Sequence, residues 1–256
     1  MQFVSKTYSH FKILQESPKG SVIRAQDKSK QFVILKKFYK DCESKFMESG
    51  EPKELHYLSI LSNTNLVPKL IDFHQDMDSA VIVMEYLHGN WEDLFEYERR
   101  RPAEDKVKII VKNIIKILYK LAEQNLYYLD IKLENIMVNK KTLNVKLIDL
   151  EDIFLIKDEY FTEITTRCGT LGYISPESLK SLPYLIKPSQ VFNIGCLIYK
   201  CITSKYAFDT KEQTFSKDPI MSKGTSLVKA LVYKCMDKNP TNRIGFHQLL
   251  DNEWFK

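Results

Sequence analysis

A polar stretch that directly follows a long apolar helix pattern is the feature that most constrains this chain. Between Lys106 and Glu123, apolar residues recur three and four apart, a spacing that predicts an amphipathic helix. The stretch that follows, NLYYLDIKLEN, places a carboxylate (Asp130), an ammonium (Lys132) and an amide (Asn135) within six residues. A carboxylate can deprotonate a hydroxyl, an ammonium can neutralise phosphate, and an amide oxygen can bind a hard cation. Solvated loops also collect these residue types, so the interpretation depends on the rest of the chain.

The composition is that of an ordinary globular protein and excludes several classes. The 256 residues are 44% hydrophobic and 28% charged, which is enough for one large or two small cores. No apolar run approaches the roughly 18 residues of a membrane span, and the N-terminal sequence MQFVSKTYSHFK lacks the apolar core of a signal peptide. Five scattered cysteines without a C-x-x-C pair favour a reducing, cytoplasmic compartment over disulfides or zinc. The formal charge of +5 is dispersed, so we expect neither a nucleic-acid nor a membrane partner.

The expected elements divide the chain near Leu87/His88. Residues 1–87 contain mostly strand patterns and one helix: strands at Tyr8–Gln15, Gly20–Gln26, Gln31–Phe38, Leu66–Phe73 and Ala80–Tyr86, and a helix at Glu51–Ser62. Residues 88–256 are mainly helical: Trp91–Arg99, Lys106–Glu123, Val191–Thr203 and Ser226–Met236, with a short hairpin formed by Ile136–Val138 and Val145–Ile148. The sequence therefore predicts a sheet-rich part followed by a helical part.

Six motifs, taken in order, resemble those of the eukaryotic-type protein kinase family over nearly the whole chain. They are VILK (Val33–Lys36) for V-A-I-K, Glu54 for the glutamate of helix C, YLDIKLEN for H-R-D-x-K-x-x-N, DLE (Asp149–Glu151) for D-F-G, CGTLGYISPE (Cys168–Glu177) for the stretch that ends in A-P-E, and Arg243 for the arginine that pairs with that glutamate. No single motif is decisive, but Asp149 follows Asn135 by fourteen residues and Glu177 follows after 28 more. The order and the spacing carry the resemblance.

This resemblance implies an α+β, two-lobed fold: a five-stranded N-lobe with helix C over residues 1–87 and a helical C-lobe over 88–256. It implies a monomeric enzyme that uses ATP and Mg²⁺ to phosphorylate a protein substrate, and Lys132 and Thr170 resemble the serine/threonine branch. The implied catalytic residues are Asp130, Lys132 and Asn135, and the implied metal ligands are Asn135 and Asp149. The implied ATP-binding residues are Leu14, Gly20, Val22, Ile34, Lys36, Glu54, Met84, Glu85, Leu87, Met137 and Asp149.

The chain departs from the family pattern at positions that support the chemistry. The glycine-rich loop corresponds to QESPKGSV (Gln15–Val22), in which only Gly20 remains, so backbone amides approach phosphate less freely. The other replacements are Ile34 for alanine, Tyr128 and Leu129 for His-Arg, Leu150 and Glu151 for Phe-Gly, and Gln190 for an aspartate. Because the arginine before the catalytic aspartate is missing, we expect only a weak switch from phosphorylation of Thr162, Thr165 or Thr166.

Three interpretations remain open. An active kinase is favoured because the groups that touch phosphate, metal and hydroxyl are retained. A pseudokinase, which keeps the fold as a nucleotide-binding or scaffolding module, is motivated by the departures. Nucleic-acid binding through the positive charge has no clustered basic face to support it. Each residue also has a structural interpretation: Lys36 could reach solvent from a strand end, and Glu54 could be an ordinary helix acid with Glu51 nearby.

Overall fold

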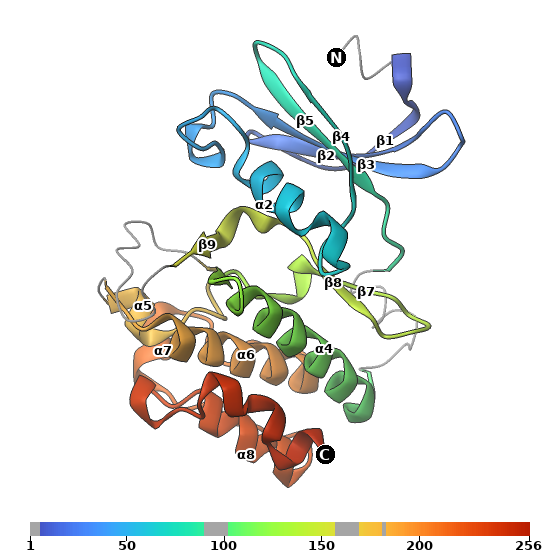
Figure 1. Ribbon diagram of the computed structural model, residues 1–256. Coiled ribbons are helices and arrows are strands. Elements are labelled where there is room, and N and C mark those ends of the chain that lie inside the picture. Colours follow the sequence, from blue (N-terminus) through green and yellow to red (C-terminus); the bar gives the residue numbers. More distant parts are fainter. Residues whose placement is uncertain (1–5, 90–101, 157–168, 181–182) are drawn as a thin grey trace. The chain divides into compact units, whose positions relative to one another are not determined.

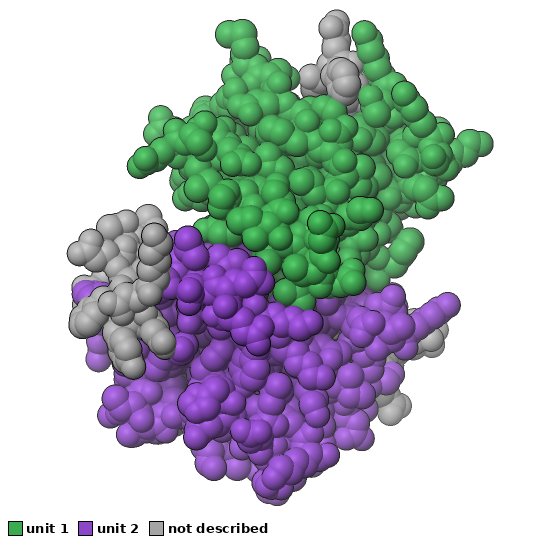
Figure 2. All heavy atoms as spheres, in the orientation of Figure 1, with its two compact units in different colours: residues 1–88, 146–151 green, residues 89–145, 152–256 purple. Residues whose placement is uncertain are grey.

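The computed structural model describes residues 6–89, 102–156, 169–180 and 183–256 (Figure 1). The chain forms two compact units, coloured separately in Figure 2. Unit 1 comprises Met1–His88 and Lys146–Glu151, and unit 2 comprises Gly89–Val145 and Asp152–Lys256. Unit 1 contains an antiparallel sheet and unit 2 is mainly helical, so the predicted α+β class is confirmed.

Unit 1 is built on a five-stranded antiparallel sheet with the order β1-β2-β3-β5-β4. The strands are β1 (Ser9–Ser17), β2 (Gly20–Gln26), β3 (Phe32–Tyr39), β4 (Leu70–Gln75) and β5 (Ser79–Glu85). β5 is buried on both faces, as its continuous apolar run predicts. β1 lies at an edge and is exposed along its whole length.

The alternation of side chains along β3 separates a core face from a functional face. Val33 and Leu35 are buried in a cluster with residues of β2 and β5. Ile34 and Lys36 point to the other face, because successive side chains alternate in a strand. Val22 lies opposite Lys36, and Met84 lies opposite Ile34. Directly opposed residues share a face, so β2, β3 and β5 present these predicted nucleotide-binding residues on one side of the sheet.

Unit 1 contains helix α2 (Lys53–Leu61), which is labelled in Figure 1. It buries Glu54 together with three leucines spaced three residues apart, the pattern that predicted it. The helix begins after Pro52, two residues later than expected, and a 3-10 turn over Glu43–Lys45 precedes it. β4 also begins later than predicted, at Leu70 rather than Leu66, because Pro68 has no N–H to donate to a sheet ladder.

Unit 2 contains α4 (Glu104–Ala122), α5 (Pro176–Lys180), α6 (Ile186–Thr203), α7 (Lys211–Ser216) and α8 (Ser226–Cys235). α6 is buried along nearly its whole length and contacts both α4 and α8. It begins five residues before the predicted start. Pro188 lies in its first turn, where the backbone N–H groups have no partner within the helix, so the proline costs little there.

Two short strand pairs complete the described part of the chain. β7 (Ile136–Val138) and β8 (Val145–Leu147) form the predicted hairpin. β6 (Leu126–Tyr128) pairs with β9 (Ile153–Leu155), which the sequence did not predict because three residues are too few for a period. The expected helix Trp91–Arg99 and the threonines Thr162, Thr165 and Thr166 lie outside the described residues. Among the described helices, none is both long and apolar enough to cross a membrane.

Candidate active site

Lys36 is the centre of a charged cluster in unit 1. Its Nζ forms an ion pair with the Glu54 carboxylate and lies 3.0 Å from Oδ1 of Asp149. Strand β3 therefore supplies the cation, α2 supplies one acid, and the segment after β8 supplies the other. The structure thus brings together three predicted ATP-binding residues that lie up to 113 residues apart in the sequence.

The two acids stabilise the Lys36 cation, whereas burial raises the pKa of Glu54 because Lys36 offsets it only in part. Burial disfavours the charged form of Lys36, but Glu54 and Asp149 outweigh it and hold the pKa of the ammonium above its ordinary value. Lys36 is therefore a permanent cation at neutral pH, as a phosphate ligand requires. Asp149 adopts a left-handed backbone with φ of 60°, which short polar residues tolerate better than most.

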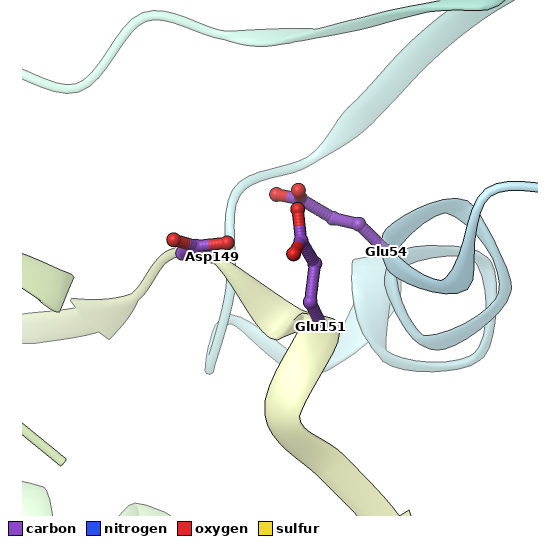
Figure 3. A group of neighbouring side chains, drawn as sticks. All are labelled: Glu54, Asp149 and Glu151. Carbon is purple, nitrogen blue, oxygen red and sulfur yellow. The ribbon is translucent and has the colours of Figure 1, made fainter. Parts of the chain in front are cut away.

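Glu151 joins this cluster from the 3-10 turn Leu150–Asp152, as Figure 3 shows. Its Oε1 lies 3.9 Å from the Nζ of Lys36, and its Oε2 contacts the Nζ of Lys45. Burial lowers the pKa of Lys45, and Asp149 only partly offsets this. A glutamate in place of the family glycine at position 151 would restrict a left-handed backbone there. The left-handed residue is Asp149 instead, and Glu151 fits within a right-handed turn.

The loop Asn125–Asn135 lies in unit 2 and is fixed at both ends. Asn125 leaves α4 in a left-handed conformation and its carbonyl accepts a bond from Ile156 N at 2.9 Å. β6 then pairs with β9, and the backbone N–H of Leu129 donates to Asp152 at 3.1 Å. A 3-10 turn over Leu133–Asn135 closes the loop. The polar sequence between a buried helix and a short sheet therefore has a defined conformation.

Asp130 is held by three donors. Its Oδ1 accepts a hydrogen bond from Thr170 at 2.7 Å, and its Oδ2 lies 2.5 Å from Lys132 Nζ and 3.0 Å from Asn135 Nδ2. Lys132 also donates to Thr170 at 2.9 Å. An ionised carboxylate offers about four acceptor positions, so these three donors, which are those found within the described residues, leave one for a substrate hydroxyl. The three predicted catalytic residues thus form one network, and Thr170 joins it.

The Asn135 amide has a defined orientation. Its Nδ2 faces three acceptors: Asp130 O at 3.1 Å, Asp130 Oδ2 at 3.0 Å and the Tyr128 hydroxyl at 2.8 Å. A carbonyl and a carboxylate cannot donate, so the nitrogen must be on this side and the oxygen Oδ1 on the other. Gln190 supports the same loop, because its Nε2 donates to the Tyr128 carbonyl at 3.0 Å. Gln190, which replaces the family aspartate, therefore still forms a hydrogen bond to the loop, and it does so as the donor.

The donor set present in each unit suits a hard cation. Asp149 supplies carboxylate oxygens on a side chain that is 41% exposed, and Asn135 supplies an amide oxygen turned away from its protein partners. Oxygen ligands of this kind are those that Mg²⁺ uses in proteins. Because the two residues belong to different units, joint binding of one ion by Asn135 and Asp149 stays a prediction.

The other predicted ATP-binding residues lie mostly in unit 1. Val22, Ile34 and Met84 share the Lys36 face of the sheet. Gly20 has a φ of 154°, and an added Cβ would lie 2.0 Å from the Lys37 carbonyl oxygen, so close strand packing alone requires glycine there. Glu85 forms an ion pair with Lys146. Leu14 is half exposed on β1, Leu87 is half-buried after β5, and Met137 lies on β7 in unit 2.

A buried ion pair joins two of the other motifs. Arg243 donates to both oxygens of Glu177, at 2.5 Å and 2.8 Å, and to the carbonyl groups of Pro188 and Asp237. The arginine side chain is 1% exposed. This pair, predicted from the sequence, is confirmed and is bidentate, the geometry that makes such pairs specific.

Sequence reasoning missed two contacts of these sites. Lys45 was not singled out, and the only signal for its pairing with Glu151 is an acid in place of the family glycine. Tyr128 was treated only as a lost histidine, although its hydroxyl gave it the capacity to bond a neighbouring amide. Neither contact follows from spacing along the chain.

The fold agrees with the comparisons with known proteins. The sequence profile of the protein kinase domain matches residues 8–255, so the chain belongs to the protein kinase domain family. It is similar to the carbon catabolite-derepressing protein kinase of Candida glabrata, with 27% identity over 82% of this chain and 35% of the relative. It is also similar to the serine/threonine-protein kinase PSK2 of Saccharomyces cerevisiae, with 27% identity over 98% of this chain and 24% of the relative. A third relative, the serine/threonine-protein kinase PLK4 of Drosophila persimilis, is 28% identical over 74% of this chain and 25% of its own.

Proposed function

We propose that this chain is the catalytic domain of a protein kinase that transfers the γ-phosphoryl group of ATP to serine or threonine of a protein substrate. The observation that carries the proposal is the network around Asp130, in which Lys132, Thr170 and Asn135 all bond one carboxylate and leave it one free acceptor position. Family membership and the names of the relatives support the same reaction.

In this mechanism each residue positions charge, and little covalent chemistry is required of the protein. Asp130 accepts the hydrogen of the substrate hydroxyl and orients its oxygen for attack. Lys132, already bonded to Asp130 and Thr170, neutralises charge that develops on the transferred phosphoryl group. Lys36, held by Glu54, binds the α- and β-phosphates. Magnesium bound by Asn135 and Asp149 would neutralise further phosphate charge.

The proposal assigns an N-lobe to residues 1–87 and a C-lobe to residues 88–256. Unit 1 corresponds to this N-lobe together with Lys146–Glu151, which are C-lobe residues by sequence. The adenine would bind to the backbone of Glu85 and Leu87, beside Val22, Ile34 and Met137, with Leu14, Gly20 and Met84 around it. Because the described cysteines Cys42, Cys196, Cys201 and Cys235 are free, we place the protein in the reducing cytoplasm. We propose that it acts as a monomer on protein rather than on nucleic acid or membranes.

Transfer of labelled γ-phosphate from ATP to a generic basic protein tests the activity. We expect Mg²⁺-dependent transfer that falls by about 10²-fold or more in Asp130→Asn, because general base catalysis contributes at least that much. Equal transfer by the wild type and by Asp130→Asn would mean a contaminating kinase and would contradict the proposal.

The pseudokinase alternative gives a different result. Such a protein would melt at a higher temperature with ADP or ATP, because a ligand that binds only the folded state stabilises it, by about 2.7 kcal/mol at 100 times Kd. It would nevertheless transfer no phosphate. A thermal shift without transfer therefore identifies a pseudokinase, and the two assays together separate the alternatives.

A further inference from the structure

Three carboxylates converge beside Lys36, where the family pattern has two. Figure 3 shows Asp149, Glu151 and Glu54 turned toward one another from the segment after β8, the following 3-10 turn and α2. One oxygen from each lies within 4.8 Å of the others. Glu151 is the added acid, because it stands where the family has glycine.

The added acid is a problem for a phosphate site. The Nζ of Lys36 already contacts Glu54 and Asp149, and Oε1 of Glu151 lies 3.9 Å away. One ammonium among three carboxylates would leave two negative charges where an anionic triphosphate is to bind. Like charges repel strongly at this separation when they are partly shielded from water. Glu151 would also compete with phosphate for Lys36.

Lys45 removes this problem through a direct contact. Its Nζ contacts Oε2 of Glu151, whereas Oε1 is the oxygen that lies 3.9 Å from Lys36 Nζ. The Lys45 side chain is 23% exposed and that of Glu151 is 13% exposed, so water screens their attraction only in part. With Lys45 included, the cluster has one net negative charge, the same as Lys36, Glu54 and Asp149 alone.

We propose that Lys45 is a positioning residue for nucleotide binding, which holds Glu151 away from Lys36 and cancels its charge. Lys45 and Glu151 thus act as a compensating pair: the acid in the metal-binding motif is tolerated only together with the lysine of the 3-10 turn Glu43–Lys45. This inference rests on the proposed function, in which Lys36 binds phosphate.

A double-mutant cycle on nucleotide affinity tests the pair. The variants are Lys45→Met, Glu151→Gln and the combination, and the measurement is equilibrium binding of a fluorescent ADP analogue with and without Mg²⁺. We expect Lys45→Met to weaken binding about tenfold, within the coupling range of contacting charges. Glu151→Gln should bind as tightly as the wild type or tighter. The double variant should return to within about threefold of the wild type.

Two further variants control for charge and for folding. Lys28→Met removes a lysine from the exposed β2–β3 turn and should leave affinity unchanged, which excludes an effect of net charge. Lys45→Arg keeps the charge and should retain most of the affinity. If Lys45→Met does not fold, the nucleotide affinity of Glu151→Gln alone tests the proposal. A tenfold loss of affinity in that variant would overturn it.

Several outcomes count against the pair. An equal loss from Lys45→Met in the wild-type chain and in the Glu151→Gln variant would mean that the two residues are uncoupled. If the wild type binds Mn²⁺ without nucleotide and Glu151→Gln does not, the three carboxylates form a metal site and not a set paired with lysine.

If the wild type binds no nucleotide, the proposed function fails. The melting temperatures of the same variants then decide the pairing, and equal losses from Lys45→Met with and without Glu151→Gln overturn it.

Discussion

Tyr128 shows how one replaced residue can take over the support of a site. It is fully buried, its hydroxyl accepts a bond from Asn135 Nδ2, and its carbonyl accepts one from Gln190. One tyrosine therefore connects the central helix α6 with the amide that we propose as a metal ligand. The residues behind a ligand fix its orientation and are nearly as important as the ligand itself.

Tyr128→Phe should weaken metal use without loss of the fold. The variant removes only the hydroxyl that fixes the Asn135 amide, so we expect the Mg²⁺ concentration for half-maximal transfer to rise about tenfold. Titration of Mn²⁺ by electron paramagnetic resonance, with a non-hydrolysable ATP analogue bound, measures the same affinity directly.

Tyr119→Phe is the matched control for this change. The Tyr119 hydroxyl donates to the Phe246 carbonyl at 2.5 Å, so the variant also deletes a phenol that makes a hydrogen bond, outside the Asn135 network. It should leave the metal titration unchanged. Identical titrations of Tyr128→Phe and the wild type would show that the tyrosine does not support a metal ligand.

At the residue scale, the sequence predicted which residues form the candidate site better than it predicted which residues contact one another. Asp130, Lys132 and Asn135 were predicted as one group, and they share one network, since they lie within six residues of each other. Lys45 and Glu151 are 106 residues apart, so only the folded chain could reveal their contact. Lys36 with Glu54 was predictable only through the family pattern, because Glu51 competed for the assignment.

Buried polar contacts connect the elements of unit 2. Arg243, which follows the 3-10 turn Pro240–Asn242, reaches Glu177 on α5 and the Pro188 carbonyl on α6. Its guanidinium also lies 4.8 Å from the Phe192 ring centroid. A single side chain thus joins α5, α6 and the C-terminal segment.

Arg243→Ala should be strongly destabilising, by about 3–5 kcal/mol, because it leaves the Glu177 carboxylate without its partner in a mostly buried position. Urea unfolding followed by circular dichroism measures this. Lys256→Ala, which breaks an exposed ion pair with Glu253, is the control and should change nothing measurable. A loss for Arg243→Ala no larger than that of the control would contradict the role of this contact.

Glu104 at the start of α4 makes unit 2 sensitive to acid. It accepts bonds from Thr225 N at 2.9 Å, Thr225 Oγ1 at 2.6 Å and Trp254 Nε1 at 2.9 Å. Partial burial favours its neutral form, but the bonds from Thr225 and Trp254 outweigh this and hold the pKa of the carboxyl below its ordinary value. Its stabilisation is therefore present above the unfolded-state pKa of about 4.3 and is lost as pH falls through the folded-state pKa.

Glu104→Gln should cost about 1 kcal/mol at pH 7, a modest value because the group is partly exposed. The difference from the wild type should shrink as the pH falls through the lowered folded-state pKa of Glu104, since the wild-type carboxyl then also becomes neutral. Asp105→Asn removes the neighbouring exposed acid of the same helix turn and is the control. A Glu104→Gln penalty that is independent of pH would exclude the charged form as its cause.

At the element scale, long periodic segments were predictable and short ones were not. The pattern in α4 gave its type and its bounds to within two residues, because eight buried apolar side chains define one face. β6 and β9 escaped prediction, since each has three residues and is specified only by its pairing with the other. The start of α6 at Ile186 was not predicted, because a proline such as Pro188 usually interrupts a helix pattern. Proline is nevertheless tolerated in the first turn of a helix.

At the scale of the whole molecule, each unit carries one part of the proposed site. Unit 1 holds the cluster of Lys36, Glu54 and Asp149, and unit 2 holds the network of Asp130, Lys132 and Asn135. The order of motifs along the sequence predicted both groups, because the family pattern fixes spacing that no single element encodes. The chain spans about a third of the first matched relative, so the activity and substrates of that whole protein do not transfer directly.

The central claim is that these two groups bind one nucleotide and one metal ion. A crystal structure with a non-hydrolysable ATP analogue and Mn²⁺, with the ion located by its anomalous scattering, tests it most directly. We predict a single peak at about 2.0–2.3 Å from oxygens of both Asp149 and Asn135, with Lys36 on the phosphates. An ion bound to one unit only, or a nucleotide that does not contact Lys36, would contradict the account.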